Sequence, residues 1–400
     1  MLNTIEEALE KIREGRMILV VDDEDRENEG DLVMSAEKAV PAAVNFMMIH
    51  ARGLLCVALP REKTEALSLG PQVAENTSRH GTNFTVSVDS SATSTGESAH
   101  DRSLTIRALA SSEARPEDFL RPGHVFPLRA ADGGVLRRAG HTEAAVDLAR
   151  LSGLAPVGVI CPIVAEDGTM ARLPRLRKMA EEHALKIVSI ADLIAYRRTR
   201  EKLVECVSKV DFPSRFGQFT LHLYRELMDG KLHLALVKGG IDPGAPVLVR
   251  VHSECLTGDL FHSLRCDCGE QLEKALKMIE EEGAGVLLYM QQEGRGIGLA
   301  NKIRAYALQE KGLDTVEANK ELGFPADLRD YGIGAQILMG LGVRKIRLLT
   351  NNPKKVIGLG GHGLSIVERV PIQISANPSN KRYLSTKREK LGHFLDLGDE

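Results

Sequence analysis

The segment "PVLVRVHSECLTGDLFHSLRCDCGEQLEKALKMIEEEG", residues 246–283, joins two kinds of structure through a turn that carries three cysteines. Residues 246–253 are an apolar, β-branched run with the length of a strand. Residues 269–283 repeat apolar side chains with a helical period, at Leu272, Ala275, Leu276 and Ile279. We therefore predict a strand, a turn and a helix, with Cys266 and Cys268 at the helix N-terminus, whose positive end favours thiolates.

The same alternation of strand and helix patterns runs through the whole chain. Further strand-like runs are "MILVV", "LLCVAL", "VGVICPIV" and "KIVSI" in the first half, and "GVLLYM" and "KIRLLT" in the second. This alternation predicts the α/β (α+β) class. Residues 190–217 pass from a helical pattern into a charged stretch, which places a boundary near residue 200, to within about ten residues. We expect two fused mixed α/β domains, residues 1–200 and 201–400.

Composition excludes several classes of function. A formal net charge of -3 provides no electrostatic footprint for nucleic acid, and no apolar run reaches the length of a membrane helix. The N-terminal residues form an amphipathic pattern with Thr4 and Glu7 spaced as a capping box, which differs from a signal peptide. We expect a cytoplasmic protein that binds neither nucleic acid nor a membrane.

Clustered cysteines in a reducing cytoplasm are more often metal ligands or catalysts than disulfides. Cys255, Cys266 and Cys268 supply one ligand fewer than a closed zinc site, and an open fourth position is the catalytic arrangement. His252 or His262 could close the site. Spacing alone favours catalytic zinc and leaves structural zinc and the absence of metal as alternatives.

Two later turns have both a structural and a functional interpretation. The glycines of "QEGRGIGL" form either a tight turn or a ligand loop, and Glu293 and Arg295 favour the loop, because a carboxylate and a guanidinium can bind a guanine-like edge and a phosphate. Lys354 and Lys355 follow a strand, as in a solvated turn, and are equally placed for phosphates at the carboxyl end of a sheet.

Residues 200–400 resemble GTP cyclohydrolase II, the zinc enzyme that opens riboflavin synthesis. The resemblance rests on "VHSECLTGDLFHSLRCDCGEQL", "QEGRGIGL", "DTVEANKELGFPADLRDYGIGAQIL" and "RLLTNNPKK". It implies that Cys255, Cys266 and Cys268 bind zinc, and that GTP contacts Arg250, Val251, His252, Ser253, Glu254, Gln271, Glu293, Gly294, Arg295, Thr315, Thr350 and Lys355.

The same resemblance implies three catalytic residues. Asp327 would accept a proton, and Arg329 would be the nucleophile toward the α-phosphate. Tyr306 would be the third catalytic residue. Arginine normally stays protonated, so this role for Arg329 needs Asp327 nearby as a base. The alternative is that Asp327 and Arg329 form a salt bridge beside a phosphate.

Residues 22–31, "DDEDRENEGD", contain seven carboxylates directly after a strand. Such a run is usually a solvated loop, but a loop after a strand is also where ligand sites gather, and carboxylates suit Mg²⁺. Farther along, Gly140, His141 and Thr142 begin an apolar-periodic helix, whose N-terminus is suited to a phosphate.

Residues 1–200 resemble 3,4-dihydroxy-2-butanone 4-phosphate synthase, through "DDEDRENEGDLVM", "HGTNFTVSVD", "RPGHVFPLRA", "GGVLRRAGHTEAAVDLARLSGL" and "EDGTMAR". The resemblance implies that Glu27 and His141 bind Mg²⁺ or Mn²⁺ and that His124 is a catalytic base. The sugar phosphate would contact Arg26, Glu27, Asp31, Arg138, Ala139, Gly140, His141 and Thr142. In this order the halves resemble the bifunctional riboflavin biosynthesis family from end to end.

Three positions depart from the synthase pattern. Pro162 stands where the family has a catalytic glutamate, and Glu97 and Leu104 replace other usual residues. We therefore expect GTP cyclohydrolase II activity, with Mg²⁺ also bound to the GTP phosphates, and little or no synthase activity on ribulose 5-phosphate. The alternative is a fully bifunctional enzyme, and a more remote one is a non-catalytic, zinc-stabilised binding or regulatory protein. We also expect a homodimer.

Overall fold

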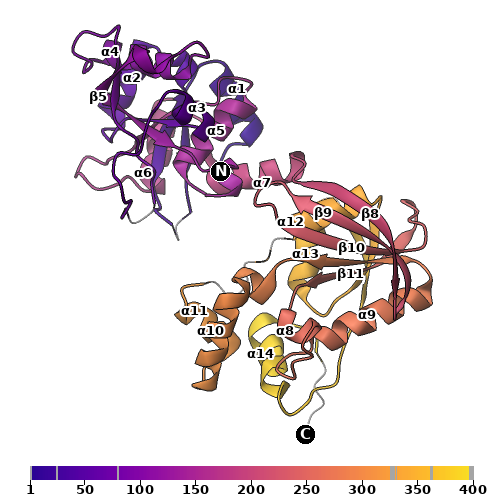
Figure 1. The fold of residues 1–400 in the computed structure, drawn as a ribbon. Coiled ribbons are helices and arrows are strands. Elements are labelled where there is room, and N and C mark those ends of the chain that lie inside the picture. The colour runs from indigo at the N-terminus through magenta and orange to yellow at the C-terminus, as the bar shows by residue number, and fades with distance from the viewer. Residues whose placement is uncertain are drawn as a thin grey trace. The chain divides into compact units, whose positions relative to one another are not determined.

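A computed structural model describes residues 2–23, 26–78, 81–324, 329, 331–360 and 364–395. The chain forms two compact units, Met1–Arg200 and Glu201–Glu400 (Figure 1). Each unit contains a seven-stranded sheet with helices. The prediction of two mixed α/β domains is therefore confirmed as a fold class. None of the described helices is long and apolar enough to cross a lipid bilayer.

The first unit is built on one mixed sheet. Its strands are β1 (Ile18–Val21), β2 (Gly30–Ser35), β3 (Cys56–Leu59), β4 (Val88–Ser90), β5 (Phe119–Arg129), β6 (Gly158–Pro162) and β7 (Ile187–Ser189). They lie in the order β4-β5-β3-β6-β2-β1-β7. β1 pairs in parallel with β7 and antiparallel with β2.

Both faces of this sheet are apolar, so both need a covering layer. Leu19 packs into a core with helices α2 (Pro41–His50), α4 (Ala99–Ala110) and α6 (Leu173–Glu182). Ile18 and Val20 point the other way, toward α1 (Ile5–Arg13), α5 (His141–Leu151) and α7 (Ile190–Arg200). Shorter helical segments are η1 (Ala36–Lys38), α3 (Arg61–Ala66), η2 (Pro116–Asp118) and η3 (Gly134–Leu136). Because successive side chains of a strand point to opposite faces of the sheet, each strand contributes to two cores, one on either face.

The second unit has strands β8 (Val204–Ser214), β9 (Gly217–Glu226), β10 (Leu232–Lys238), β11 (Pro246–Ser253), β12 (Gly285–Met290), β13 (Lys345–Leu349) and β14 (Ser365–Val370). Their order is β14-β13-β11-β12-β10-β9-β8. The charged stretch that we assigned to the boundary from sequence is mostly strand β8. It lies at the sheet edge, where polar side chains are tolerated because one side of the strand has no neighbour in the sheet.

Helix α9 (Cys268–Glu282) packs its predicted apolar face against β11 and β12, with Ala275, Leu276 and Ile279 buried. The other helices are α8 (Leu256–Asp259), η4 (Glu293–Gly296), α10 (Gly298–Glu310), α11 (Thr315–Glu321), α12 (Gly332–Gly340), α13 (Pro353–Gly360) and α14 (Lys381–Leu391).

Strand order explains where the second unit can hold a ligand. β13, β11 and β12 are neighbours and parallel, so their carboxyl ends meet at one edge of the sheet. The cysteine loop follows β11, the glycine turn follows β12, and the threonine-lysine segment follows β13. Three segments far apart in sequence are thereby brought to one edge, which is where ligands bind in α/β sheets.

Candidate functional site

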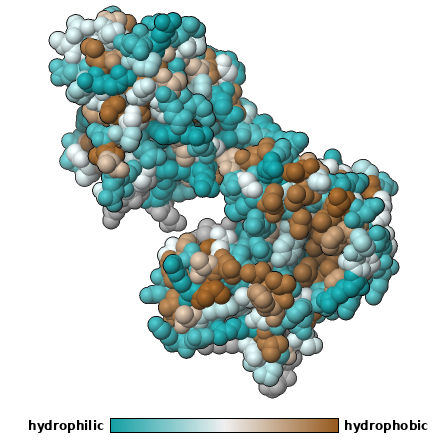
Figure 2. Space-filling view, in the orientation of Figure 1, coloured by the Kyte–Doolittle hydropathy of each residue, from teal (hydrophilic) through white to brown (hydrophobic). Residues whose placement is uncertain are grey.

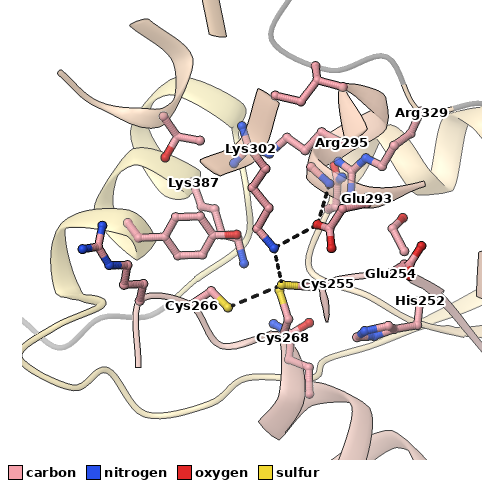
Figure 3. A pocket seen from close by; sticks show the side chains of 18 of the residues that line it. His252, Glu254, Cys255, Cys266, Cys268, Glu293, Arg295, Lys302, Arg329 and Lys387 are labelled. Atoms are coloured by element: carbon pink, nitrogen blue, oxygen red, sulfur yellow. Dashed lines mark hydrogen bonds and ion pairs between the residues drawn. The ribbon is translucent and has the colours of Figure 1, made fainter. Parts of the chain in front are cut away.

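Three cysteine thiols converge at this edge of the second unit (Figure 3). The Sγ atoms of Cys255, Cys266 and Cys268 all lie within 4.8 Å of one another, and those of Cys255 and Cys266 are 3.7 Å apart. His252 instead places Nε2 3.0 Å from Asp259, and His262 is exposed. Among the described residues of this unit, the group that could hold a metal ion thus consists of the three cysteine thiols. Such a donor set fits Zn²⁺ with one position left for another ligand.

The thiol cluster is packed closely against backbone. A Cβ atom built on Gly258 would lie 2.8 Å from the Sγ of Cys266 and 3.1 Å from the Sγ of Cys255, so a side chain at this position would collide with the sulfur atoms. The pKa of Cys255 is lowered, because the neighbouring thiols of Cys266 and Cys268 and the ammonium of Lys302 stabilise its thiolate. The cluster is therefore suited to at least one thiolate ligand.

Lys302 is a buried residue of this site that sequence reasoning missed. Its Nζ lies 3.2 Å from the Sγ of Cys255 and 2.9 Å from both Thr257 Oγ1 and Glu293 Oε1. Burial lowers the pKa of Lys302, but the contacts with Glu293 and Cys255 outweigh it and raise the pKa. In the sequence, a lysine on a helix looks like a solvated surface residue. The fold alone turns Lys302 inward (Figure 3).

Glu293 anchors the glycine turn to its surroundings. Its Oε2 accepts a hydrogen bond from the backbone N–H of Leu256, at 2.7 Å. Its Oε1 accepts hydrogen bonds from the backbone N–H of Gly294 and from Nζ of Lys302. Arg295, the next side chain, has a φ of 62°, a left-handed conformation that is costly for a residue other than glycine. This backbone directs the Arg295 side chain into the cleft.

A single cleft collects most of the residues that the sequence assigned to GTP. The predicted residues that line it are Arg250, His252, Ser253, Glu254, Gln271, Glu293, Gly294, Arg295, Thr315, Thr350 and Lys355, with Tyr306, Arg329 and the three cysteines. Val251 does not line it, and its carbonyl instead accepts a hydrogen bond from Lys355 Nζ at 2.8 Å. Asp327 lies outside the described residues.

Several buried polar atoms of the cleft have no hydrogen-bond partner among the residues that the structure describes. They are Arg250 Nε, His252 Nδ1, Ser253 Oγ and Arg295 Nη1. Buried donors and acceptors are nearly always satisfied in proteins, by the protein, water or a ligand. Because these four atoms belong to residues around one cleft, their hydrogen-bonding capacity is available there to water or to a polar ligand.

The cleft carries a strong positive charge. Burial, together with the charges of Lys387, Arg329, Arg295 and Lys355, lowers the pKa of His393 to about 3. Burial is the larger cause, and the four nearby cations that add to it create a field that attracts anions. We predicted Arg295, Arg329 and Lys355 from the motifs but not Lys387 or His393, which lie after all of the motifs in the sequence.

Tyr306 and Thr315 lie on the two helices beside the thiols. The hydroxyl of Tyr306 is 3.4 Å from Thr257 Oγ1. Thr315 is the first residue of α11, where Asp314 forms the N-cap and a capping box with Glu317. Both predicted residues line the cleft, Tyr306 from the α10 side and Thr315 from the α11 side.

The first unit contains a second cluster suited to a metal. Ligand atoms of Asp22, Glu27 and His141 lie within 4.8 Å of one another, although they come from a strand end, a loop and the start of α5. Arg26 contacts Asp22 at 2.8 Å and Glu27 at 2.7 Å. Two carboxylates and an imidazole fit a divalent cation such as Mg²⁺ or Mn²⁺. We predicted Glu27 and His141 as metal ligands but not Asp22. Residues 22–31 contain seven carboxylates, and the sequence does not distinguish Asp22 from the others.

The segment from Arg138 to Thr142 leads into the N-terminus of α5. Arg138 pairs with Glu143 at 2.7 Å, and Gly140 is the N-cap residue. Asp31 on β2 lies 3.9 Å from His141, and burial raises the pKa of its carboxyl group to about 6. The predicted sugar-phosphate residues are therefore grouped around β2, the loop before it and the start of α5.

His124 is not part of this group within one chain. It lies on β5, where Nδ1 contacts Asp89 at 2.7 Å, and its side chain is 43% exposed. Three strand spacings separate β5 from β2 in the sheet order, which corresponds to roughly 14 Å. The structure thus places the predicted base His124 at a distance from Asp31.

Pro162 lies at the end of β6, directly opposite Asp31 in the pairing with β2. A carboxylate of the chain therefore faces the position where the synthase pattern has glutamate. Glu166 is exposed and pairs with Arg175 at 2.5 Å, Glu97 is exposed, and Leu104 is half-buried on α4. None of these three contributes to the described Asp22–Glu27–His141 cluster.

Comparison with known proteins matches each unit to a family. Residues 6–196 match the 3,4-dihydroxy-2-butanone 4-phosphate synthase family, and residues 205–371 match the GTP cyclohydrolase II family. The riboflavin biosynthesis protein RibBA of Aquifex aeolicus is 61% identical over 98% of both chains. That of Bacillus cytotoxicus is 59% identical over 99% of this chain and 100% of the relative.

A solved structure is similar over most of the chain. It is RibBX, described as a two-domain 3,4-dihydroxy-2-butanone 4-phosphate synthase from A. baumannii, with a TM-score of 0.70, 39% identity, and coverage of 93% of this chain and 100% of RibBX. This similarity agrees with the two mixed α/β units described above.

Proposed function

The chain belongs to the riboflavin biosynthesis protein RibBA family, and we propose that it is a bifunctional enzyme. Residues 1–200 would convert ribulose 5-phosphate to 3,4-dihydroxy-2-butanone 4-phosphate and formate. Residues 201–400 would convert GTP to 2,5-diamino-6-(5-phosphoribosylamino)pyrimidin-4(3H)-one, formate and pyrophosphate. Full-length relatives and matches to both families support this alternative over our expectation of an inactive first half.

The observation that carries the cyclohydrolase proposal is the convergence of three thiols, four unsatisfied polar atoms and several cations on one cleft. Cys255, Cys266 and Cys268 would hold zinc. When bound, zinc supplies Lewis-acid activation of water for attack on the purine. Arg295, Arg329 and Lys355 would bind the triphosphate, because these three cations line the cleft and lie near His393.

Release of pyrophosphate would use Arg329 as a nucleophile. A guanidinium nitrogen that loses a proton to Asp327 attacks the α-phosphorus, the bond to the β-phosphate oxygen breaks, and pyrophosphate leaves. Water later hydrolyses the resulting phosphorus-nitrogen bond and restores the arginine. The position of Arg329 on the cleft supports this role, and a salt bridge beside the phosphate is the alternative.

The synthase proposal rests on the cluster of Asp22, Glu27 and His141 beside the N-terminus of α5. The cluster would hold Mg²⁺ or Mn²⁺, and the backbone N–H groups at the start of α5 would bind the phosphate. Rearrangement of a ketose phosphate requires several proton transfers. Since Pro162 carries no proton, we assign the acid-base role at this end of the sheet to Asp31, which faces it.

We further propose that the protein forms a homodimer. The loop between Cys255 and Cys266 presents Leu260, Phe261 and Leu264 to solvent, with exposed fractions of 61%, 70% and 65%. Apolar side chains also gather on the visible surface of the second unit (Figure 2). Grouped exposed apolar residues favour self-association. Analytical ultracentrifugation of Phe261→Ser should show more monomer than the parent protein.

One preparation can test both activities. Purified protein is incubated with Mg²⁺ and Zn²⁺ and with either GTP or ribulose 5-phosphate, and formate is measured in each reaction, with pyrophosphate in the first. We expect formate from both substrates. Formate from GTP alone would restrict the protein to the cyclohydrolase. Zinc binding without turnover of GTP would instead support the non-catalytic binding alternative.

A further inference from the structure

Helix α14 lies beyond residues 205–371, the segment that matches the cyclohydrolase family. Two of its side chains, Tyr383 and Lys387, nevertheless line the thiol cleft, as does His393 just after it. Neither the sequence motifs nor the family match gives this helix a role. Its contacts therefore show what the C-terminal segment adds to the site.

Lys387 binds the turn that carries two of the thiols. Its Nζ lies 2.6 Å from Oδ1 of Asp267, the residue between Cys266 and Cys268. Asp267 is 1% exposed and Lys387 8%. The ammonium also lies 4.5 Å from the centroid of the Tyr383 ring, one turn earlier in α14. Removal of either charge would leave the other buried without its partner, which costs far more than the loss of an exposed ion pair.

Asp267 also connects to residues that we predicted to contact the nucleotide. Its Oδ2 accepts a hydrogen bond from Gln271 Nε2 at 2.6 Å. Gln271 Oε1 in turn accepts one from Arg250 Nη2 at 2.5 Å, and Arg250 donates to the carbonyl of Leu349 at 2.9 Å. A chain of polar contacts thus runs from α14 through the thiol turn to the ends of β11 and β13.

The same helix is anchored on the other side of the cleft. Lys390 contacts Asp314 and, at 2.8 Å, Glu317, the two residues of the capping box that starts α11. After the helix, the backbone N–H of Phe394 donates to the carbonyl of Asn351, in the turn after β13, at 2.9 Å. Helix α14 is therefore joined to the thiol turn, to α11 and to the segment after β13.

We propose that Lys387 is a positioning residue for the cyclohydrolase reaction, a role that rests on the proposed function. Through Asp267 it holds Cys266 and Cys268 in the geometry that binds zinc, and it keeps Gln271 and Arg250 in place for the nucleotide. The C-terminal helix is then part of the catalytic unit.

The test measures zinc affinity of the full chain, by competition with a chromogenic chelator, alongside kcat and KM for GTP. Lys387→Met should weaken zinc binding by about 10- to 100-fold, the usual effect of losing a residue that supports a metal ligand. Asp267→Asn should weaken zinc binding to a similar extent. The double variant should bind zinc no more weakly than either single variant, because each substitution removes the same Lys387–Asp267 interaction. Lys387→Arg should recover part of the affinity.

Arg388→Met provides the matched control, since Arg388 is the next cation on α14 and its side chain is 43% exposed. This variant should bind zinc like the parent. Parental zinc affinity in Lys387→Met combined with a raised KM for GTP would overturn the proposal and make Lys387 a direct contact of the nucleotide. Additive effects in the double variant would also overturn it.

Two further outcomes are separable. If circular dichroism shows that Lys387→Met does not fold, Asp267→Asn and Lys387→Arg decide the question, because both preserve the size of the side chain more closely. If the parent binds zinc but releases no formate from GTP, the proposed function fails. The zinc affinities of the variants would still decide whether Lys387 positions the thiol turn.

Discussion

The Nζ atom of Lys302 lies 3.2 Å from the Sγ atom of Cys255, inside the cleft that holds the three thiols. The same ammonium contacts Glu293 at 2.9 Å, so one buried cation joins the thiol cluster to the glycine turn. Loss of this charge would leave the Cys255 thiolate and the Glu293 carboxylate without their shared cation in a buried site. Leaving a buried charge unpaired typically costs about 3–5 kcal/mol.

We therefore predict that Lys302→Met lowers the zinc affinity by about 10- to 100-fold and lowers formate release from GTP at saturating zinc. Chelator competition and a formate assay measure the two effects. Lys311→Met, at the exposed end of the same helix, is the control and should match the parent. Normal zinc binding in Lys302→Met would show that the contact with Cys255 is not needed for the metal site.

Removal of one thiol tests the metal site itself. Cys266→Ser should abolish zinc binding and ring opening of GTP, because two thiols do not hold zinc as three do. The first unit should remain folded and keep its activity on ribulose 5-phosphate. Metal analysis and both formate assays check this, with exposed Cys206→Ser as the control. Full formate release from GTP by a zinc-free variant would refute the catalytic-zinc proposal.

Arg329 is predicted to matter for the phosphates. Arg329→Ala should reduce pyrophosphate release by at least about 10²-fold, since it removes both the proposed nucleophile and a charge beside the triphosphate. Arg304→Ala, on the exposed side of α10, serves as the control. Pyrophosphate release at the parental rate in Arg329→Ala would mean that Arg295 and Lys355 handle the phosphates without it.

Position 162 tests the first unit. Asp31→Asn should lower formate release from ribulose 5-phosphate by about 10²- to 10⁴-fold, the usual contribution of an acid-base group. Pro162→Glu should raise the rate above that of the parent, because it adds a carboxylate opposite Asp31. Glu166→Gln should have no effect, since Glu166 is exposed and pairs with Arg175. A parent without activity that is rescued by Pro162→Glu would show that Asp31 does not replace the glutamate.

Glu7 provides a prediction about pH. Its hydrogen bonds with Lys186, Thr4 and Asn3 lower its pKa from 4.5 to about 2. A carboxyl group with a lowered folded-state pKa stabilises the fold above its unfolded pKa and loses this effect as pH falls through the folded value. The melting temperature of the first unit should therefore differ between the parent and Glu7→Gln at pH 6, and the difference should shrink between pH 4.5 and pH 2. A constant difference across this range would contradict the assignment.

Local pattern was enough to predict the elements around the site. The helical period of Leu272, Ala275, Leu276 and Ile279 predicted α9, and the spacing of Thr4 and Glu7 predicted the capping box of α1. Both follow from interactions between residues a few positions apart, which the sequence displays directly. The resemblance to two families likewise depends on continuous motifs, and it anticipated most residues that line the cleft.

Other features required the tertiary structure. Strand β8 was missed because an edge strand tolerates polar residues and so lacks the apolar pattern of a buried one. Lys302 and Lys387 looked like ordinary surface lysines, and Asp22 was one carboxylate among seven. These three residues reach their sites because strand order and helix packing bring distant segments together. Lys387 and Asp267, for example, are in contact although 120 residues separate them in the chain. Such contacts depend on which elements become neighbours, and local periodicity carries no information about that choice.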